Sequence, residues 1–95
     1  MPDPTPLLAA AERLADRFRA MPQSSLTRQA PAGLELARAL ARASGAEGEI
    51  PDAGVFVVGD QIAVAAHDLA LTLAASDGPE ADRVLAEALK AIAKL

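Results

Sequence analysis

The chain has 95 residues and a net charge of −4, with alanine at 24 positions and leucine at 13. A chain of this length forms one domain rather than two. It contains no cysteine, one histidine and two aromatic residues, both phenylalanine. This composition excludes a disulfide scaffold, a thiol nucleophile, a metal site made of several histidines from one protomer, and an aromatic platform for stacking bases. We therefore expect neither a metal nor a cofactor, and no catalytic activity.

Charge is distributed unevenly between the two halves of the chain. Residues 1–46 carry six arginines against four acidic residues, whereas residues 47–95 carry nine acidic residues against three basic ones. Acidic residues accompany the arginines along the predicted helices, so the simplest interpretation is solvated helix faces with ion pairs one turn apart. The asymmetry would also allow a head-to-tail attraction between protomers, which salt would screen.

The amino-terminal residues and the overall composition indicate where the protein acts. Residues 1–6 lack the basic flank and the apolar run of a secretory signal. We expect residues 1–4 to be disordered within a single helical domain that spans residues 1–95. Frequent alanine, arginine and leucine are typical of a GC-rich bacterial genome.

One apolar stretch, residues 55–75, is long enough to cross a membrane. An aspartate near the middle of a membrane span costs about 2.5–3.5 kcal/mol, and alanine does little to offset that cost. Four polar residues interrupt the stretch: Asp60, Gln61, His67 and Asp68. We therefore expect a soluble, cytoplasmic protein that does not contact the membrane.

The first predicted helix begins at Thr5. The Thr5 hydroxyl can cap this helix, and Pro6 suits its first helical position because the missing N–H does no harm there. Met21 and Pro22 end the helix. Its apolar residues form one stripe with helical spacing: Leu7, Leu8, Ala11, Leu14, Ala15 and Phe18.

The second predicted helix contains a proline. Within a continuous helix, Pro31 would remove a hydrogen bond and clash with the preceding turn, at a cost of about 3 kcal/mol. We therefore expect a short turn over residues 25–30, which Ser24 or Ser25 can cap, followed by a main helix with Pro31 in its first turn. Its buried stripe is Leu34, Ala37, Leu40 and Ala41.

A polar connection and the third predicted element follow. Residues 45–54 offer no side chain that suggests chemistry, and Ile50 alone could contact the core. Residues 55–58 are β-branched or aromatic and could form a strand, but a lone hairpin is only marginally stable. A helix over residues 54–75, capped by Asp52 or Asp60, fits the apolar spacing better: Val55, Val58, Ile62, Ala65, Ala66, Leu69 and Leu73.

The fourth predicted helix starts at Pro79, after the turn signal Asp77-Gly78. Glu80 and Asp82 lie in its first turn, where negative charge stabilises a helix. These elements predict an all-α fold. We expect a small antiparallel bundle of four helices, in which Pro31 can break the second helix and the hydrophobic third helix lies at the centre.

The third helix carries a second apolar row, formed by Val57, Val64 and Leu71, on the side opposite its main stripe. A helix that is apolar nearly all round is surrounded by other helices or by a partner. A bundle of this size has few large side chains with which to cover both sides. We therefore expect an interaction module, either a homodimer or an adaptor that binds a helical partner through this row.

A second hypothesis is a small-molecule or pH sensor built on Asp60, His67 and Asp68. Histidine titrates near neutrality, and a neighbouring carboxylate would adjust it. The simpler interpretation of His67 is a hydrogen-bonded histidine at a contact between helices. The sequence lacks the Glu-x-x-His and His-Glu-x-x-His spacings of helical metal sites.

A third hypothesis is nucleic-acid binding through Arg28, Arg38 and Arg42, with residues 25–44 as a helix-turn-helix unit. Gln29 is the one residue of this segment suited to reading bases, and the chain as a whole is acidic. Nucleic acid is therefore the least favoured partner.

Overall fold

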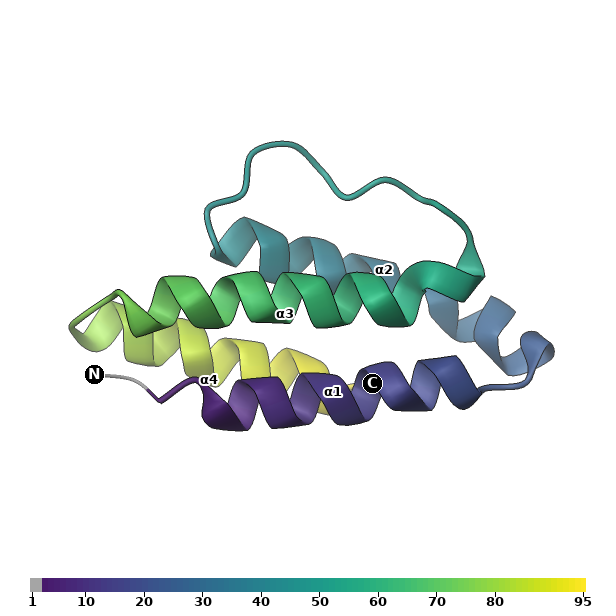
Figure 1. The fold of residues 1–95 in the computed structure, drawn as a ribbon, viewed down its shortest axis with the longest axis horizontal. Helices are drawn as coiled ribbons and strands as arrows, with labels where there is room; N and C mark the ends of the chain where they lie inside the picture. The colour runs from purple at the N-terminus through teal and green to yellow at the C-terminus, as the bar shows by residue number, and fades with distance from the viewer. Residues whose placement is uncertain (1–2) are drawn as a thin grey trace.

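The computed structural model describes residues 3–95 (Figure 1). A short 3₁₀ turn, η1, directly precedes α3, and no strand is present among the described residues. The predicted all-α bundle of four helices is therefore confirmed. The elements are α1 (Thr5–Ala20), α2 (Gln23–Ala43), η1 (Val55–Val57), α3 (Val58–Ala74) and α4 (Pro79–Ala93).

Helix α1 begins at Thr5 as predicted, but the Thr5 hydroxyl does not cap it. Thr5 is already the first helical residue, whereas a capping side chain must come from a residue that precedes the helix. Asp3, which precedes the helix, supplies an acceptor instead: its Oδ1 accepts a hydrogen bond of 3.0 Å from the Thr5 amide. This hydrogen bond lowers the pKa of Asp3. Of the segment predicted to be disordered, residues 1–2 lie outside the described residues.

Helix α2 continues through Pro31 without a break, so the predicted turn over residues 25–30 is wrong. Pro31 deprives the Thr27 carbonyl of its usual donor, but Thr27 is exposed and water can take the place of that donor. Leu26 and Ala30 are buried in the core. Their burial helps to offset the cost of the proline, and the first two turns of α2 remain helical.

Residues 55–58 are helical. The sequence was compatible with either a helix or a strand here, and the helix was the prediction. These residues form η1 and the first residue of α3. Neither predicted cap is in place, because Val57 is the residue before α3 and Asp60 lies inside its first turn. Asp52 instead accepts a hydrogen bond of 3.0 Å from the amide of Gly54 and so shapes the connection.

The long connection between α2 and α3 sets the topology. It runs back along the bundle, so that α2 and α3 point in the same direction (Figure 1). The Thr72 hydroxyl, near the end of α3, donates to the Ser44 carbonyl at the end of α2 over 3.3 Å, as this direction requires. Ten extended residues reach about 33 Å, close to the length of α2. The predicted antiparallel arrangement therefore does not hold for this pair of helices.

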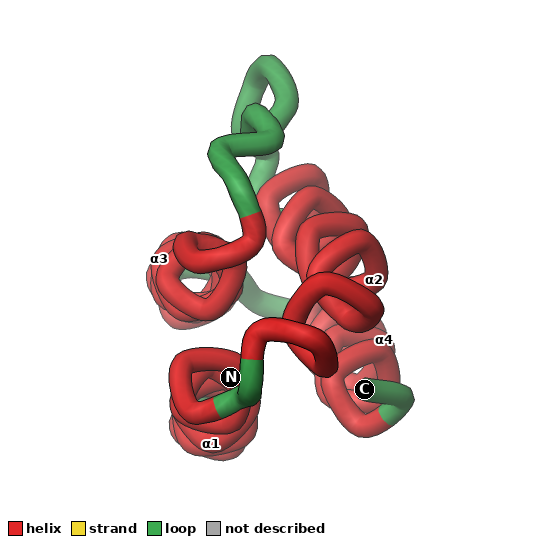
Figure 2. The backbone as a smooth tube through the Cα atoms, turned by 90° about the vertical axis from the view of Figure 1, so that its right-hand side faces the viewer, coloured by secondary structure: helices red, strands yellow, loops and turns green. Residues whose placement is uncertain are grey.

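The four helices lie at the corners of the bundle, with α3 diagonally across from α4 (Figure 2). Helix α3 packs on α1 and α2 and is not enclosed at the centre as predicted. One face of α3 fills the core, and the opposite face is directed away from the other helices. The largest fully buried side chains are Phe18, Leu7, Leu40, Ile62 and Leu69.

Residues Val55–Ala74 satisfy the length and hydropathy criteria for a membrane span, with a mean hydropathy of 1.3. The core helix of a folded protein satisfies the same criteria. Helix α3 places its most apolar side on α1 and α2, so these criteria alone are weak evidence for a membrane span.

Candidate functional site

The outward face of α3 is the surface formed by Val57, Asp60, Val64, His67, Asp68 and Leu71. Val64 and Leu71 lie two turns apart on the side opposite the buried Ile62 and Leu69. Val64 is 61% exposed and Leu71 is 60% exposed, whereas Val57 is half-buried. The structure therefore leaves two of the three predicted interface residues open and covers the third in part.

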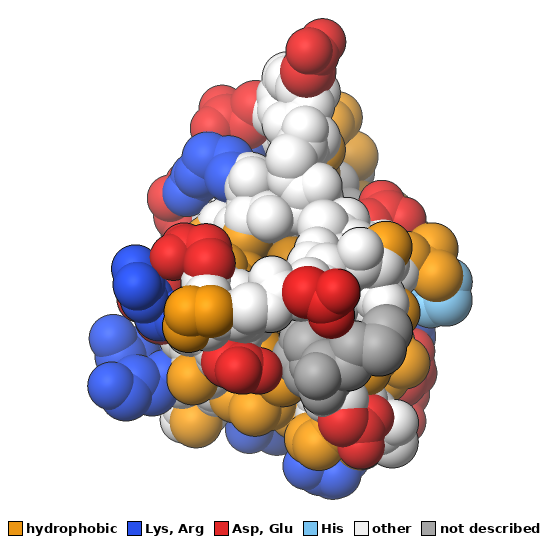
Figure 3. All heavy atoms as spheres, turned by 90° about the vertical axis from the view of Figure 1, so that its left-hand side faces the viewer, with side chains coloured by type: hydrophobic (Ala, Val, Ile, Leu, Met, Phe, Trp, Pro, Cys, Tyr) orange, Lys and Arg blue, Asp and Glu red, His pale blue; other side chains and the backbone are white. Residues whose placement is uncertain are grey.

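Phe56 adds a hydrophobic side chain that the sequence pattern did not assign to this surface. It is 73% exposed and lies in η1, directly before α3. Phe56 belongs to neither of the two apolar rows that helical spacing indicates in residues 55–73. Figure 3, a view onto the end of the bundle where α3 turns into α4, shows other hydrophobic side chains at the surface among charged ones.

An apolar groove of about 400 Å³ lies beside the outward face, between α3 and the connection. Gln61 Nε2 donates a hydrogen bond of 3.0 Å to the Pro51 carbonyl and so ties the connection to α3. The Gln61 Oε1 atom is buried without a hydrogen-bond partner. The groove is lined by Ile50, Ala53, Val57, Asp60, Gln61 and Val64.

Asp60 is bound to α1 rather than free on the outward face. Arg19 donates to Asp60 Oδ1 from Nε at 3.0 Å and from Nη2 at 2.7 Å. The Nη1 atom of Arg19 also donates to Asp16 over 2.9 Å. The hydrogen bonds to Asp60 and then Asp16 raise the pKa of Arg19. The charge of Asp60 is therefore compensated within the protomer.

His67 and Asp68 lie between Val64 and Leu71, and both are exposed. Within residues 3–95 neither side chain forms a hydrogen bond or an ion pair, so His67 is not the hydrogen-bonded residue between helices that its simpler interpretation predicted. Asp60 is two helical turns away from His67, about 10 Å along the axis. The three predicted sensor residues share one face but do not converge, and no cluster of three metal-binding side chains occurs among the described residues.

The arginines of α2 hold the connection in place. Arg38 is mostly buried, and its Nε donates to the Ile50 carbonyl over 2.9 Å. Its Nη1 pairs with Glu35 at 3.4 Å, and Arg42 pairs with Glu49 at 3.8 Å. Two of the three arginines proposed to bind nucleic acid therefore have acidic partners within the protomer, and Arg28 contacts the Ser25 hydroxyl.

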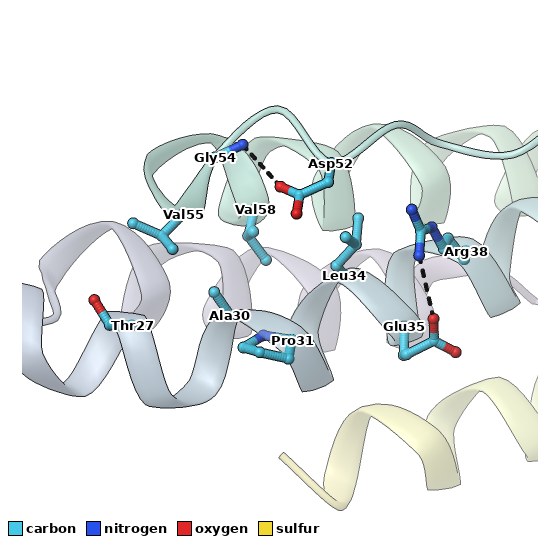
Figure 4. Close-up of a pocket in the computed structure, with 10 residues that line it drawn as sticks. All are labelled: Thr27, Ala30, Pro31, Leu34, Glu35, Arg38, Asp52, Gly54, Val55 and Val58. Atoms are coloured by element: carbon cyan, nitrogen blue, oxygen red, sulfur yellow. Dashed lines mark hydrogen bonds and ion pairs between the residues drawn. The ribbon is translucent and has the colours of Figure 1, made fainter.

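A second cavity, of about 270 Å³, lies between α2 and the start of α3 (Figure 4). Arg38, Glu35 and Asp52 lie at its rim, and each is already engaged, Arg38 with Glu35 and Asp52 with the Gly54 amide. Its floor is apolar and consists of Ala30, Leu34, Val55 and Val58. Sequence reasoning missed this cavity because the connection returns along α2 and brings Asp52 and Gly54 back to its first half, a tertiary arrangement that local sequence patterns do not determine.

Protein-family models, curated protein sequences and solved structures were compared with the chain, and none of them matches. Among residues 3–95, two of the three large hydrophobic side chains that are exposed, Val64 and Leu71, lie on the outward face of α3.

Proposed function

We propose that the protein is a protein–protein interaction module that associates with itself through the outward face of α3. The observation that carries this proposal is the exposure of Val64 and Leu71 on a helix whose opposite face fills the core. Full burial of such a side chain stabilises by about 1.5–3 kcal/mol. More than half of each side chain is still exposed. Burying it in a contact therefore contributes about 1 kcal/mol or more of binding free energy for each of these residues in each copy.

The compensated charge of Asp60 supports the proposal. Charged residues are depleted at the centre of protein interfaces, because burying an uncompensated charge is costly. Arg19 compensates the charge of Asp60, whereas Asp68, which lies between Val64 and Leu71, has no side-chain partner within residues 3–95 and would have to stay in contact with water at the edge of the contact. The adjoining groove adds a concave apolar surface to the exposed side chains. We place this interaction in the cytoplasm.

Sensing and nucleic-acid binding find less support from the geometry. Asp60 is engaged by Arg19 and lies two turns from His67, so a ligand would not meet both groups at once. Arg38 and Arg42 are paired with acidic side chains, which weakens their attraction for phosphate.

The test is the molar mass of Val64→Asp, measured by light scattering behind size-exclusion chromatography. Ala86→Asp is the matched control, because it places the same charge on an exposed position of α4. We expect the native chain and Ala86→Asp to exceed the monomer mass of 9.7 kDa, and Val64→Asp to be a helical monomer. A native chain that remains monomeric at every concentration would contradict the proposal.

A further inference from the structure

A groove between α1 and α4 combines an apolar floor with a rim whose charged residues are both arginines, Arg13 and Arg17. Its volume of about 390 Å³ lies within the range of about 300–1,000 Å³ that is usual for small-molecule sites. We propose that this groove binds a small anionic amphiphile, a carboxylate that carries a short aliphatic chain. The proposal does not depend on the self-association proposed above.

The floor of the groove lies where the apolar sides of the two helices meet. Leu14 and Ile92 are buried in the core, whereas Ala10 and Leu89 are half-buried and remain partly open. Helices α1 and α4 pack on each other, and α3 lies diagonally across from α4 (Figure 2). An aliphatic chain in the groove therefore covers apolar surface that the fold leaves open, on a side of the bundle distinct from the outward face of α3.

The two arginines of the rim lie one helical turn apart on α1, about 6 Å along its axis, and both are exposed. Within residues 3–95 Arg13 forms no hydrogen bond or ion pair, and Arg17 donates to the main-chain oxygen of Leu95. A guanidinium has five N–H donors, so this bond leaves donors of Arg17 free. Two like charges one turn apart repel each other, and a bound anion removes that repulsion. The pair therefore favours a carboxylate, which arginine can bind through two parallel hydrogen bonds.

The acidic residues of α1 do not compensate these arginines. Arg19 pairs with Asp16 at 2.9 Å and with Glu12 at 3.8 Å. Arg19 also binds Asp60 of α3, so this cluster lies on the side of α1 that packs on α3 rather than on α4. Neither carboxylate of α1 forms an ion pair with the arginines of the groove, whose charges remain available to a ligand.

The end of α4 adds positive charge beside the groove. Glu87 lines a different cavity, between α4 and α2, and residues 88–95 contain no acid. Lys90 and Lys94 lie in this last part of the helix, where their charges offset the negative end of the helix dipole. The groove is thus bordered by positive charge in a chain whose net charge is −4, and this sign selects an anionic head group.

An NMR titration with octanoate at neutral pH, below the concentration at which it forms micelles, tests the site. We expect the methyl signals of Leu14, Leu89 and Ile92 to shift and saturate while those of Val64 and Leu71 stay constant. Octylammonium carries the same chain with the opposite charge, and acetate carries the same charge without the chain. Each should bind at least about tenfold more weakly than octanoate.

Arg13→Gln removes one cation from the rim and keeps a side chain that favours helix. It should weaken octanoate binding by about three- to tenfold, with the fold confirmed by circular dichroism. Arg28→Gln is the matched control, because Arg28 is an exposed arginine of α2 outside the groove, and it should leave the affinity unchanged.

Three results would overturn the proposal. The first is equal binding of octanoate and octylammonium, which would show that the arginines do not select the charge. The second is an unchanged affinity of Arg13→Gln for octanoate. The third is a titration in which the signals of Leu89 and Ile92 do not respond, whether or not those of Val64 and Leu71 shift.

Discussion

The Phe18 ring of α1 lies directly on the backbone of α2 at Gly33. A Cβ atom at Gly33 would lie 2.8 Å from Phe18 Cζ and 2.7 Å from Val58 Cγ1. Carbon atoms in favourable contact are about 3.5–4.0 Å apart, so only glycine fits at this position. The contact joins α1, α2 and α3, and it explains a glycine in the middle of a long helix.

Gly33→Ala should therefore destabilise the protein by about 1–3 kcal/mol through overpacking, although alanine favours helix by about 1 kcal/mol. Urea denaturation followed by circular dichroism measures the change. Adding Phe18→Leu removes part of the ring that the new methyl group meets, so the double variant should lose less stability than the two single losses combined. Unchanged or increased stability of Gly33→Ala would show that this contact is not tight.

Pro31→Ala should stabilise the protein by about 1–2 kcal/mol, because it restores the hydrogen bond to the Thr27 carbonyl inside α2. Pro31 is exposed, so the substitution removes little packing. Pro79→Ala is the control, because Pro79 lies in the first turn of α4, where proline costs no hydrogen bond. The free energy of unfolding should rise for Pro31→Ala alone, and a loss of stability would be evidence against our account of α2.

Arg38→Ala should release the connection between α2 and α3. Removing the guanidinium leaves the Ile50 carbonyl without its donor, and we expect a loss of about 1–2 kcal/mol with faster amide exchange in residues 45–54. Arg42→Ala is the matched control. Both arginines pair with Glu49, Arg38 at 3.9 Å and Arg42 at 3.8 Å, but Arg42 is exposed and makes no bond to the Ile50 carbonyl, so its loss should be below about 0.5 kcal/mol. Equal effects of the two substitutions would indicate that the Ile50 hydrogen bond adds nothing.

Asp3→Ala should loosen the first turn of α1 at neutral pH, because the Thr5 amide loses its acceptor. The pKa of Asp3 is lowered on folding, so its stabilising contribution is complete above its ordinary value of 3.8 and disappears as the pH falls through the lowered value. Hydrogen exchange of the amides in the first turn should therefore differ between the native chain and the variant at neutral pH and converge in strong acid. A difference independent of pH would exclude the carboxylate as the cause.

The amphipathic helices were the most predictable part of the fold. The stripe from Leu7 to Phe18 and the turn signals around Pro22 and Gly78 determine α1 and α4, since local spacing and breakers act within a few residues. The continuity of α2 could not be predicted in this way. Its proline is a local penalty, whereas the burial of Leu26 and Ala30 that offsets it is a tertiary effect.

The outward face of α3 was predictable in part, because helical spacing is a local property of the sequence. The period of seven residues placed Val64 and Leu71 on one side of α3, and the structure leaves both exposed. Asp60 was predicted to cap the third helix or to belong to a sensor, but Arg19 of α1, 41 residues earlier in the chain, binds its carboxylate. The groove beside Gln61 depends on where the connection returns, which the sequence of the connection does not determine.

The most direct test of the central proposal is a dilution series of the native chain, followed by the methyl NMR signals of Val64 and Leu71. If the outward face of α3 is the contact surface, these signals shift with protein concentration while those of the buried Leu7 and Leu40 stay constant. Signals of Val64 and Leu71 that do not change at any concentration would contradict the proposal.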